Sequence, residues 1–337
     1  MAKIKIAING FGRIGRVFFR QAFSNDQVEV VAINDLGDTE NLAYLLRYDS
    51  VYGRFDKDVS VKDGHMKVGD KEIRMLQEKD PGNLPWKELD IDVVIESTGV
   101  FTSREKAAPH LDAGAKRVII SAPAKDEITP TSTPNVGIDH LKLDKITSNA
   151  SCTTNATTPI ASIMGANPGV KKALLNTVHG YTATQAIVDG PVKGHDFRKG
   201  RAAAVNIIPS STGAALATEK AIPSMKGKFD GIAMRVPVPA GSIIDFTFIA
   251  ERSTSVEEIN NIFREAVKKE EWSGVLSVTE EQLVSSDILG MPFGSIVDLS
   301  MTRVVDGDLV KVLSWYDNEW GYASMLLKHV VAVSQLL

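Results

Sequence analysis

The only cysteine of the chain, Cys152, lies among small polar residues and is the first candidate for covalent chemistry. A β-prone stretch, Lys145–Ser148, precedes it, and the pattern predicts a helix over Ala156–Met164. Cys152 is therefore expected near a helix N-terminus, where the helix dipole stabilises a thiolate. A free thiol with a pKa of about 8.5 is only ~3% ionised at pH 7, so these surroundings decide whether the sulfur is a good nucleophile.

A base for this thiol is expected at His179, the first histidine after Cys152, within the strand-like Ala173–Tyr181. An isolated cysteine is usually a small buried hydrophobe. Here the neighbours carry hydroxyls and amides rather than branched aliphatic groups, which favours a reactive role. The other histidines lie in helical or variable-looking contexts and are interpreted as structural or solvated: His65, His110, His140, His195 and His329.

A second pattern with chemical meaning is Gly10-Phe11-Gly12-Arg13-Ile14-Gly15, directly after the first expected strand. In a G-x-G-x-x-G loop the first glycine permits a tight turn, the second lets the backbone approach a pyrophosphate, and the third allows close packing of helix on strand. The helix that follows offers free N–H groups and its positive end to phosphates. Alone the pattern also fits a tight structural turn, but its place between strand and helix favours a dinucleotide site.

The next expected strand ends in Asn34-Asp35, and Asp35 lies about 20 residues after Gly15, where a ribose-binding acid belongs. A carboxylate accepts hydrogen bonds from a ribose 2′-hydroxyl and repels a 2′-phosphate. The following Leu36–Glu40 is acidic and supplies no Arg or Lys for a phosphate. We therefore expect NAD rather than NADP. The competing interpretation of Asp35 is a solvated acid in a turn.

The N-terminal half alternates strand and helix patterns, which predicts a doubly wound α/β domain with a parallel sheet. A helix is expected over Gly12–Phe23, because Ile14, Val17, Phe18 and Phe19 gather on one helical face. The expected strands are short, apolar and β-branched: Ile4–Asn9, Val28–Asn34, Asp92–Ser97 and Arg117–Ser121.

The C-terminal half has longer strands with few helices between them, which predicts an α+β domain with a largely antiparallel sheet. Within Ser242–Ala250, apolar residues alternate with more polar ones, so one face should be buried. Helices are expected over Val256–Lys268, where Ser255 and Glu258 fit a capping box, and over Ala323–Leu337. The other expected strands are Gly231–Val238, Ser295–Val304 and Asp308–Tyr316, and the domain change should fall near Ser148–Cys152.

Composition restricts the class of protein. The 337 residues suggest two domains, and 43% hydrophobic with 24% charged residues is ordinary for a globular chain. The net charge of −4 favours neither nucleic acid nor an anionic membrane as partner. One cysteine excludes an intrachain disulfide and a cysteine framework for zinc, and it fits a reducing compartment. Met1–Lys3 leads into only a short apolar run, so neither an export signal nor a membrane span is expected, and the expected location is cytoplasmic.

Together these segments resemble the phosphorylating glyceraldehyde-3-phosphate dehydrogenase family of glycolysis over essentially the whole chain. The matching motifs occur in family order: Ile8–Arg16, Ser148–Asn155, Asp189–Pro191, Ile207–Ala215 and Ser314–Glu319. The resemblance implies an NAD-binding Rossmann domain, residues 1–151 with the closing segment 318–337, and a catalytic domain, residues 152–317. It also implies a homotetramer in which the Thr182–Arg201 loop lies near a neighbouring subunit's cofactor.

For the chemistry, the resemblance implies that Cys152 attacks the aldehyde of D-glyceraldehyde 3-phosphate and that His179 takes the hydroxyl proton as hydride leaves for NAD. Inorganic phosphate would then cleave the thioester to give 1,3-bisphosphoglycerate. No metal is implied. The substrate phosphate would be held by Thr182, Thr184 and Arg235, and the attacking phosphate by Ser151, Thr153, Thr212 and Gly213. Without the resemblance, Arg235 also fits a salt-bridge partner and the threonines fit simple β-formers.

For the cofactor, the resemblance implies that Asn318 orients the nicotinamide carboxamide, with Tyr322 nearby. Gly190-Pro191 is typical of the NAD-using members and agrees with Asp35. The remaining residues implied to serve NAD are those of the glycine motif, Gly10, Phe11, Gly12, Arg13, Ile14 and Gly15, and the strand ends Thr98, Gly99 and Ser121.

Rival functions stay open at this point. An erythrose-4-phosphate dehydrogenase on the same scaffold would release its acyl group to water, and the retention of every attacking-phosphate candidate favours the phosphorylating enzyme instead. Aspartate-semialdehyde dehydrogenases use a similar covalent scheme, but the matching motifs are not theirs. A non-catalytic NAD-binding protein predicts a damaged site, whereas Cys152, His179 and Arg235 are all present.

Overall fold

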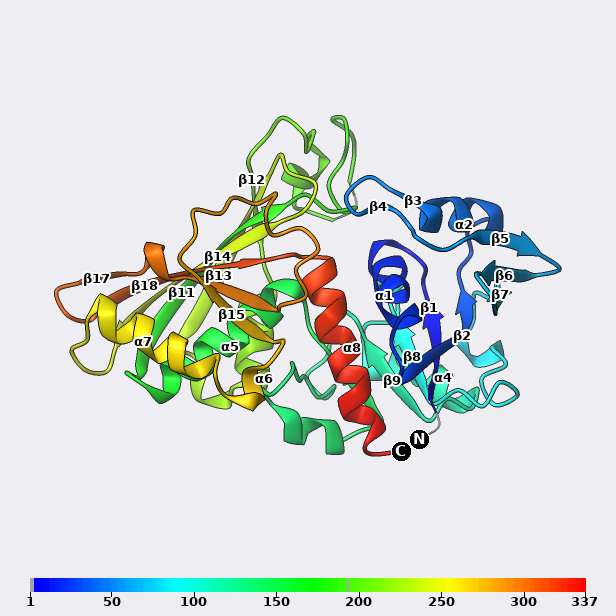
Figure 1. Ribbon diagram of the computed structural model, residues 1–337, viewed down its shortest axis with the longest axis horizontal. Helices are drawn as coiled ribbons and strands as arrows, with labels where there is room; N and C mark the ends of the chain where they lie inside the picture. Colours follow the sequence, from blue (N-terminus) through cyan, green and yellow to red (C-terminus); the bar gives the residue numbers. More distant parts are fainter. Residues whose placement is uncertain (1–2, 193) are drawn as a thin grey trace. The chain divides into compact units, whose positions relative to one another are not determined.

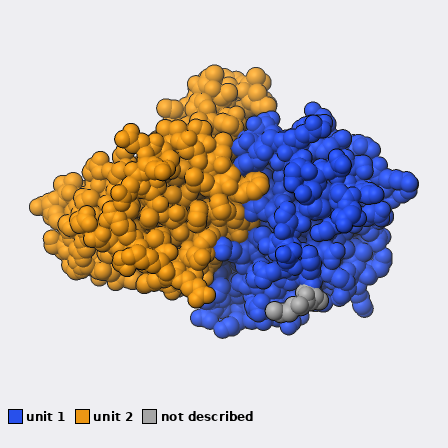
Figure 2. Space-filling model, viewed as in Figure 1, with its two compact units in different colours: residues 1–132, 137–150, 326–337 blue, residues 133–136, 151–325 orange. Residues whose placement is uncertain are grey.

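The computed structural model describes residues 3–192 and 194–337, and the chain forms two compact units (Figures 1 and 2). Unit 1 comprises the chain up to residue 132, residues 137–150 and residues 326–337, and unit 2 comprises residues 133–136 and 151–325. The start of the chain, where no export signal is expected, and Lys193 of the 182–201 loop lie outside the described residues.

Unit 1 is built on an eight-stranded sheet whose first six strands are parallel, in the order β10-β9-β8-β1-β2-β7. The order reverses between β1 and β8, which is the switch point of a doubly wound Rossmann sheet, so the predicted fold class is confirmed. These strands are β1 (Ile4–Asn9), β2 (Val28–Asn34), β7 (Lys71–Leu76), β8 (Val93–Glu96), β9 (Arg117–Ile120) and β10 (Ile146–Ser148). Antiparallel β6 (His65–Val68) and β5 (Val59–Lys62) extend the edge beyond β7.

The helices of unit 1 pack their apolar stripes on this sheet. In α1 (Arg13–Phe23) the side chains of Val17, Phe18 and Phe19 are fully buried, as their helical spacing predicts. The remaining elements are α2 (Thr39–Arg47), α3 (Arg104–Ala107), α4 (Pro109–Asp112), η1 (Pro81–Asn83), η2 (Ile138–Lys142) and the small pair β3 (Tyr48–Asp49) and β4 (Gly53–Arg54).

Unit 2 contains a sheet in the order β12-β13-β11-β14-β18-β16-β15, with β17 paired to β18. Most pairs are antiparallel, as predicted, but β11 and β13 run parallel, and so do β15 and β16. The strands are β11 (Val170–Gly180), β12 (Ile208–Ser211), β13 (Phe229–Val236), β14 (Ser242–Ala250), β15 (Leu276–Thr279), β16 (Ser295–Asp298), β17 (Arg303–Val305) and β18 (Leu309–Tyr316).

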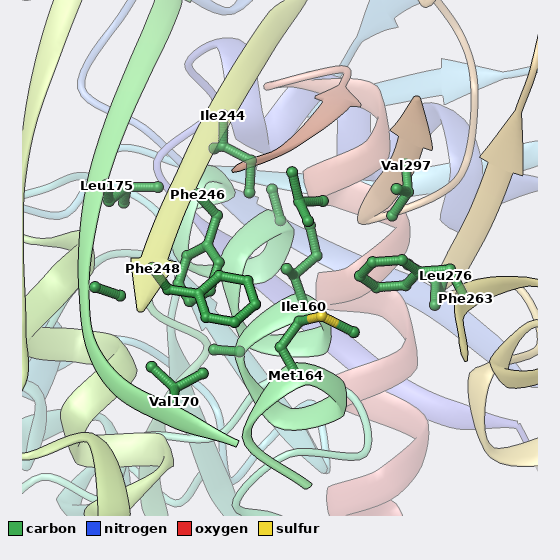
Figure 3. Packing of buried hydrophobic residues seen from close by; sticks show 14 of the residues in the cluster. Ile160, Met164, Val170, Leu175, Ile244, Phe246, Phe248, Phe263, Leu276 and Val297 are labelled. Carbon is green, nitrogen blue, oxygen red and sulfur yellow. The ribbon is translucent and has the colours of Figure 1, made fainter. Parts of the chain in front are cut away.

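Helices cover one face of this second sheet and close its core. The buried residues of β14 alternate as predicted, and Phe246 and Phe248 meet Ile160 and Met164 of the central helix (Figure 3). The helices are α5 (Cys152–Ala166), α6 (Ala214–Ala221), α7 (Val256–Ala266) and α8 (Trp320–Ser334), and the short turns are η3 (Phe197–Gly200), η4 (Pro223–Met225), η5 (Glu270–Trp272) and η6 (Leu299–Met301). Helix α8 begins in unit 2 and ends in unit 1.

Three local predictions are wrong in detail. The strand expected over Ser295–Val304 breaks after Asp298, because that carboxylate accepts hydrogen bonds from the backbone N–H and hydroxyl of Ser300 and starts the turn η6. The helix expected from Ala156 begins four residues earlier, at Cys152. In the capping box before α7, Ser255 accepts from the Glu258 N–H, but the Glu258 carboxylate binds Arg252 and Thr254 instead of closing the box.

Residues 3–192 and 194–337 contain neither a helix that could span a membrane nor a cluster of metal-ligating side chains. None of the helices there is both long enough and apolar enough to cross a membrane. In the same part of the chain, no three His, Cys, Asp or Glu side chains gather as a metal site would require.

We predict that Phe246→Ala lowers the free energy of unfolding by about 3–5 kcal/mol, because it removes a fully buried ring from the centre of the unit 2 core. That ring lies 5.6 Å from Phe229 and 5.5 Å from Phe248, centroid to centroid. Urea unfolding at fixed protein concentration measures the change. The control is Leu143→Ala, at a side chain that is 71% exposed, and an equal loss in both variants would contradict the assignment of the core.

Candidate active site

The sulfur of Cys152 lies 3.4 Å from Nε2 of His179. Cys152 is the first residue of α5, and the hydroxyl of Ser151 caps that helix by accepting from the Thr154 N–H. His179 lies near the carboxyl end of β11, where the strand ends at Gly180. The helix start and the strand end therefore bring the two predicted reactive side chains into contact, 27 residues apart in the chain.

The ring nitrogen Nδ1 of His179 has two close polar neighbours. Nδ1 lies 2.6 Å from the carbonyl oxygen of Gly180, which can only accept a hydrogen bond. Nδ1 also lies 2.6 Å from Nη1 of Arg235, which can only donate, so these two contacts by themselves do not assign the ring proton. With the proton on Nδ1 and bonded to Gly180, the lone pair of Nε2 is directed at the Cys152 sulfur. This is the arrangement that a base needs in order to take a proton from the thiol.

Arg235 adds a positive charge to the pair. It is the register partner of His179, because β11 and β13 are parallel, and its Nη1 lies 2.6 Å from His179 Nδ1 and 3.3 Å from the Gly180 oxygen. Nε of the same guanidinium is buried and has no hydrogen-bond partner in the structure. The alternative interpretation of Arg235 as a salt-bridge partner finds no acidic side chain among these contacts.

These surroundings keep the resting pair neutral. Burial, and then the charge of Arg235, lower the pKa of His179 to about 3. Burial raises the pKa of the Cys152 thiol, and the opposing effects of Arg235 and of the hydrogen bonds from Thr153 do not cancel it. Burial of Cys152 therefore opposes the ready formation of a thiolate that its place at a helix N-terminus favours.

Tyr316 supports the pair from the side and was not singled out from the sequence. Its ring packs edge-on against His179, with centroids 5.8 Å apart, and its hydroxyl bridges Thr153 (2.9 Å) and Thr177 (2.8 Å). Burial raises the pKa of Tyr316 well above its usual range, so it remains a neutral phenol. The only signal in the sequence was its membership of the Ser314–Glu319 motif.

The candidate anion-binding residues fall into separate groups in unit 2. The hydroxyls of Thr182 and Thr184 lie 2.9 Å apart in the loop after β11. Thr212 and Gly213 lie at the N-terminus of α6, where the Thr212 hydroxyl accepts from the Ala214 N–H. Thr153 is buried, and its hydroxyl lies 2.9 Å from that of Tyr316.

Asn318 and Tyr322 are both buried in unit 2. Oδ1 of Asn318 accepts from the Gly241 N–H (3.0 Å) and the Ser242 hydroxyl (2.9 Å), which fixes the amide and leaves its NH₂ group as a donor. Burial, and to a lesser extent a charge on Cys152, raise the pKa of Tyr322. Pro191 is exposed in the loop after β11.

In unit 1 the glycine motif has the local geometry that its residue types predict. Gly10 has φ +96°, and a Cβ there would lie 2.6 Å from the Thr98 nitrogen. At Gly15 a Cβ would lie 2.3 Å from the Gly10 oxygen, so α1 packs directly on the loop. A Cβ on Gly12, at the N-cap of α1, would meet no atom within 4 Å, which leaves the helix N-terminus open to a phosphate.

A pocket of about 910 Å³ lies at the carboxyl ends of β1, β2 and β8, where a doubly wound sheet binds its ligand. Of the predicted cofactor residues, Gly10, Gly12, Asp35 and Thr98 line it. Asp35 also accepts from the backbone N–H groups of Phe11 (2.6 Å) and Gly37 (2.8 Å), which ties the glycine loop to the end of β2.

The other predicted cofactor residues of unit 1 do not line this pocket. Phe11 is buried against Phe19, Arg13 pairs with Asp49, and Ser121 donates to the Glu96 carbonyl. Ile14 and Gly99 likewise lie outside the lining. The sequence analysis did not assign several other residues that line the pocket to the cofactor. They are Asn34 and Leu36 at the end of β2, Glu78, Lys79 and Pro81 after the unpredicted strand β7, and Phe101 in the loop after β8. Lys79 thus brings a cation to the pocket that Leu36–Glu40 does not supply.

Comparison with known proteins agrees with this geometry. Residues 4–104 match the model for the NAD binding domain of glyceraldehyde 3-phosphate dehydrogenase, and residues 151–318 match the model for its C-terminal domain. The chain belongs to the glyceraldehyde-3-phosphate dehydrogenase family. It is 50% identical to the glyceraldehyde-3-phosphate dehydrogenase of Geobacillus stearothermophilus over 321 residues, 95% of each chain. It is 47% identical to that of Streptomyces coelicolor over 339 residues, 99% of each chain, and 46% identical to the Escherichia coli glyceraldehyde-3-phosphate dehydrogenase A over 98% of this chain and 99% of that one.

Membership of the glyceraldehyde-3-phosphate dehydrogenase family makes the chain an NAD-dependent dehydrogenase. NAD is the cofactor, and the matched NAD-binding region contains the glycine motif and Asp35. The enzyme class, the cofactor and the family expected from the sequence are therefore confirmed.

We predict that Arg235→Leu shifts the alkylation of Cys152 by iodoacetamide to higher pH. Arg235 is the largest influence that lowers the pKa of Cys152, so removing its charge raises that pKa further and delays formation of the thiolate. Initial alkylation rates between pH 6 and 10, from peptide mass spectrometry, locate the midpoint. Arg264→Leu, at a partly exposed arginine of α7 that pairs with Glu280, is the control. A midpoint that moves to lower pH in Arg235→Leu would contradict the electrostatics of the pair.

We further predict that Asp35→Asn weakens NAD and improves the relative use of NADP by about tenfold or more, because the variant no longer repels a 2′-phosphate. Asparagine keeps an acceptor for the Phe11 N–H but turns its NH₂ group toward the Gly37 N–H, so the ratio of the two cofactors, and not the absolute affinity, is the decisive quantity. Steady-state kcat/KM with each cofactor measures the preference. The neighbouring acid Asp38, the N-cap of α2, provides the control Asp38→Asn. Equal cofactor preference in the wild type and Asp35→Asn would show that Asp35 does not contact the ribose.

Proposed function

We propose that the chain converts D-glyceraldehyde 3-phosphate, NAD and inorganic phosphate into 1,3-bisphosphoglycerate and NADH through a thioester on Cys152. The observation that carries this proposal is the 3.4 Å contact between the Cys152 sulfur and a neutral His179 beside Arg235, in a chain whose N-terminal region is an NAD-binding domain. A pair made only for stability would not need a buried cation with an unsatisfied N–H next to it.

The first step is addition of the thiol to the aldehyde. Nε2 of His179 accepts the thiol proton as sulfur bonds to the carbonyl carbon, and the same proton is then delivered to the carbonyl oxygen. The product is a neutral thiohemiacetal on Cys152, and His179 is again neutral. The low pKa of His179 suits it to hold this proton only briefly.

The second step is oxidation of the thiohemiacetal. NAD supplies the hydride acceptor when it is bound. His179 removes the hydroxyl proton as the C–H bond breaks, which leaves a thioester on Cys152 and an imidazolium beside Arg235. The imidazolium of His179 and the guanidinium of Arg235 repel each other. This repulsion favours release of the proton from His179 as long as no anion neutralises Arg235.

In the third step, a phosphate oxygen attacks the thioester carbonyl and the Cys152 thiolate leaves. Arg235 and the hydroxyl pair of Thr182 and Thr184 are suited to the phosphate of the substrate, while Ser151, Thr212 and Gly213 offer hydroxyl and backbone N–H groups for the attacking anion. The charge of Arg235 also stabilises the departing thiolate.

The residues present fit NAD. The open N-terminus of α1 at Gly12 suits the pyrophosphate, and the carboxylate of Asp35 in the 910 Å³ pocket suits the adenosine ribose. In unit 2, the fixed amide of Asn318 presents its NH₂ group, which suits a carboxamide oxygen.

The experiment is NADH formation from glyceraldehyde 3-phosphate with and without inorganic phosphate. We expect turnover that depends on phosphate, and we expect Cys152→Ala to lose activity while it still binds NAD. The matched control is Thr157→Ala, a buried small side chain of the same helix. Turnover that ignores phosphate would indicate hydrolysis and favour erythrose 4-phosphate as substrate. Full activity in Cys152→Ala would refute the mechanism.

We also propose that the protein acts as a homotetramer. The face of the unit 2 sheet opposite its helices bears large exposed apolar side chains, including Leu174 (66%) and Ile232 (50%), around a groove of about 1030 Å³. The loop after β11 exposes Ile187 (85%) and Phe197 (72%). Apolar patches of this kind mark protein interfaces, and the family resemblance implies a tetramer.

A substitution on this sheet face tests the assembly. We expect Leu174→Asp to convert the tetramer into smaller species, because a charge would be buried at the interface. Light scattering after size-exclusion chromatography gives the mass, and Leu143→Asp, at another exposed leucine, is the control. A tetramer unchanged by Leu174→Asp would exclude this face as an interface.

The proposed location is the cytoplasm. Cys152 is a free cysteine and the proposed nucleophile, so its thiol must remain reduced. A reducing compartment provides that condition.

A further inference from the structure

A chain of fully buried polar side chains lies beneath the NAD pocket of unit 1. Asn9, Trp86, Glu96 and His110 are each at most 1% exposed, and they come from the end of β1, the turn after η1, the end of β8 and α4. Burying a carboxylate is costly unless it is fully hydrogen-bonded. None of the roles proposed above uses this group.

On one side, the direction of every hydrogen bond follows from the backbone. The Glu78 N–H donates to Oδ1 of Asn34 (2.8 Å), so the Asn34 amide nitrogen must face the opposite way. That nitrogen donates to the Glu78 carbonyl (2.8 Å) and to Oδ1 of Asn9 (2.7 Å). The amide nitrogen of Asn9 is thereby left to donate to Oε2 of Glu96 (2.6 Å).

On the other side, the direction follows from Trp86. An indole nitrogen can only donate, and Nε1 of Trp86 lies 3.0 Å from Nδ1 of His110. Nδ1 is therefore an acceptor, and the ring proton is on Nε2, which lies 3.2 Å from Oε2 of Glu96. Neutral His110 thus donates to the same carboxylate oxygen as Asn9.

The second oxygen of Glu96 holds the loop after β8. Oε1 accepts from the backbone N–H of Thr98 (2.9 Å) and from its hydroxyl. The preceding Ser97 donates its hydroxyl to the Gly10 carbonyl (2.6 Å). Three groups that can only donate and one hydroxyl converge on the two oxygens of Glu96, and such surroundings stabilise a buried carboxylate anion.

These contacts connect the loops that form the pocket. Five residues that take part in the hydrogen bonds described above also line the pocket: Asn9, Asn34, Glu78, Ser97 and Thr98. The backbones of Gly10 and Thr98 are in close contact, since a Cβ on Gly10 would lie 2.6 Å from the Thr98 nitrogen. A shift of the Thr98 loop therefore displaces the first turn of the glycine motif.

We infer that Glu96 is the anionic centre that sets the shape of the NAD pocket, and that His110 and Trp86 are positioning residues that orient it from outside the ligand's reach. The inference rests on the proposed placement of NAD at the glycine motif. It assigns to a histidine expected to be merely structural a specific role in cofactor affinity.

Substitutions of the network test this inference through a split between cofactor affinity and turnover. Glu96→Gln replaces an acceptor by an NH₂ group that confronts the donors of Asn9 and His110, and His110→Leu removes one donor. We expect each to raise the KM and Kd for NAD by about tenfold or more, with kcat at saturating NAD within about twofold, because unit 2 is unaltered. His110→Gln, whose amide can accept from Trp86 and donate to Glu96, should restore most of the affinity.

The control is Trp272→Phe, which removes part of a buried ring from the unit 2 core. It should lower the melting temperature without changing NAD affinity. Glu96→Gln and His110→Leu variants that lose stability but bind NAD like the wild type would overturn the inference, because the network would then be structural only. If His110→Leu does not fold, Glu96→Gln alone decides.

Two measurements separate this inference from the proposed reaction. Calorimetric titration with NAD needs no turnover, so it remains decisive even if glyceraldehyde 3-phosphate is not the substrate. Nitrogen-15 NMR of labelled histidine should show His110 with its proton on Nε2. A proton on Nδ1 in the wild type would contradict the donor order that begins at Trp86.

Discussion

The parallel pairing of β11 with β13 constrains the reactive end of this molecule more than any other interaction. In a sheet that is otherwise mostly antiparallel, it places Arg235 beside His179 at the same level of the sheet. The guanidinium then lies against the imidazole, while the start of α5 brings Cys152 to the other ring nitrogen. The charge balance of the site follows from this register, since a shift by one residue would turn Arg235 to the opposite face.

In both units, buried polar side chains make hydrogen bonds whose direction is fixed by their neighbours. In unit 2, the backbone N–H of Gly241 and the hydroxyl of Ser242 fix the amide of Asn318. In unit 1, Trp86 and the Glu78 backbone do the same for the network around Glu96. Groups that can only donate or only accept therefore orient those that can do either, and this makes each site rigid before a ligand arrives.

The sequence supported the class of both sheets, the strand ends that carry Asn9 and Asn34, and the Cys152 and His179 candidates, because these depend on local pattern and residue type. It did not show β5 to β7, whose short mixed strands have weak periodicity, and so it missed Glu78 and Lys79 in the pocket. The sequence analysis also expected Cys152 to ionise readily, whereas burial raises the pKa of its thiol. That burial depends on segments distant in the chain, so local pattern does not reveal it. Tyr316 and the Glu96 network arise from tertiary contacts alone, which no spacing rule reveals.

The contact between Arg235 and His179 makes proton binding and anion binding reciprocal. Arg235 lowers the proton affinity of His179, and an anion that neutralises Arg235 relieves part of that effect. By thermodynamic linkage, a protonated His179 must then hold the anion more tightly by the same factor. The strength of the base is consequently not a fixed property of the site but changes with the charge of whatever occupies it.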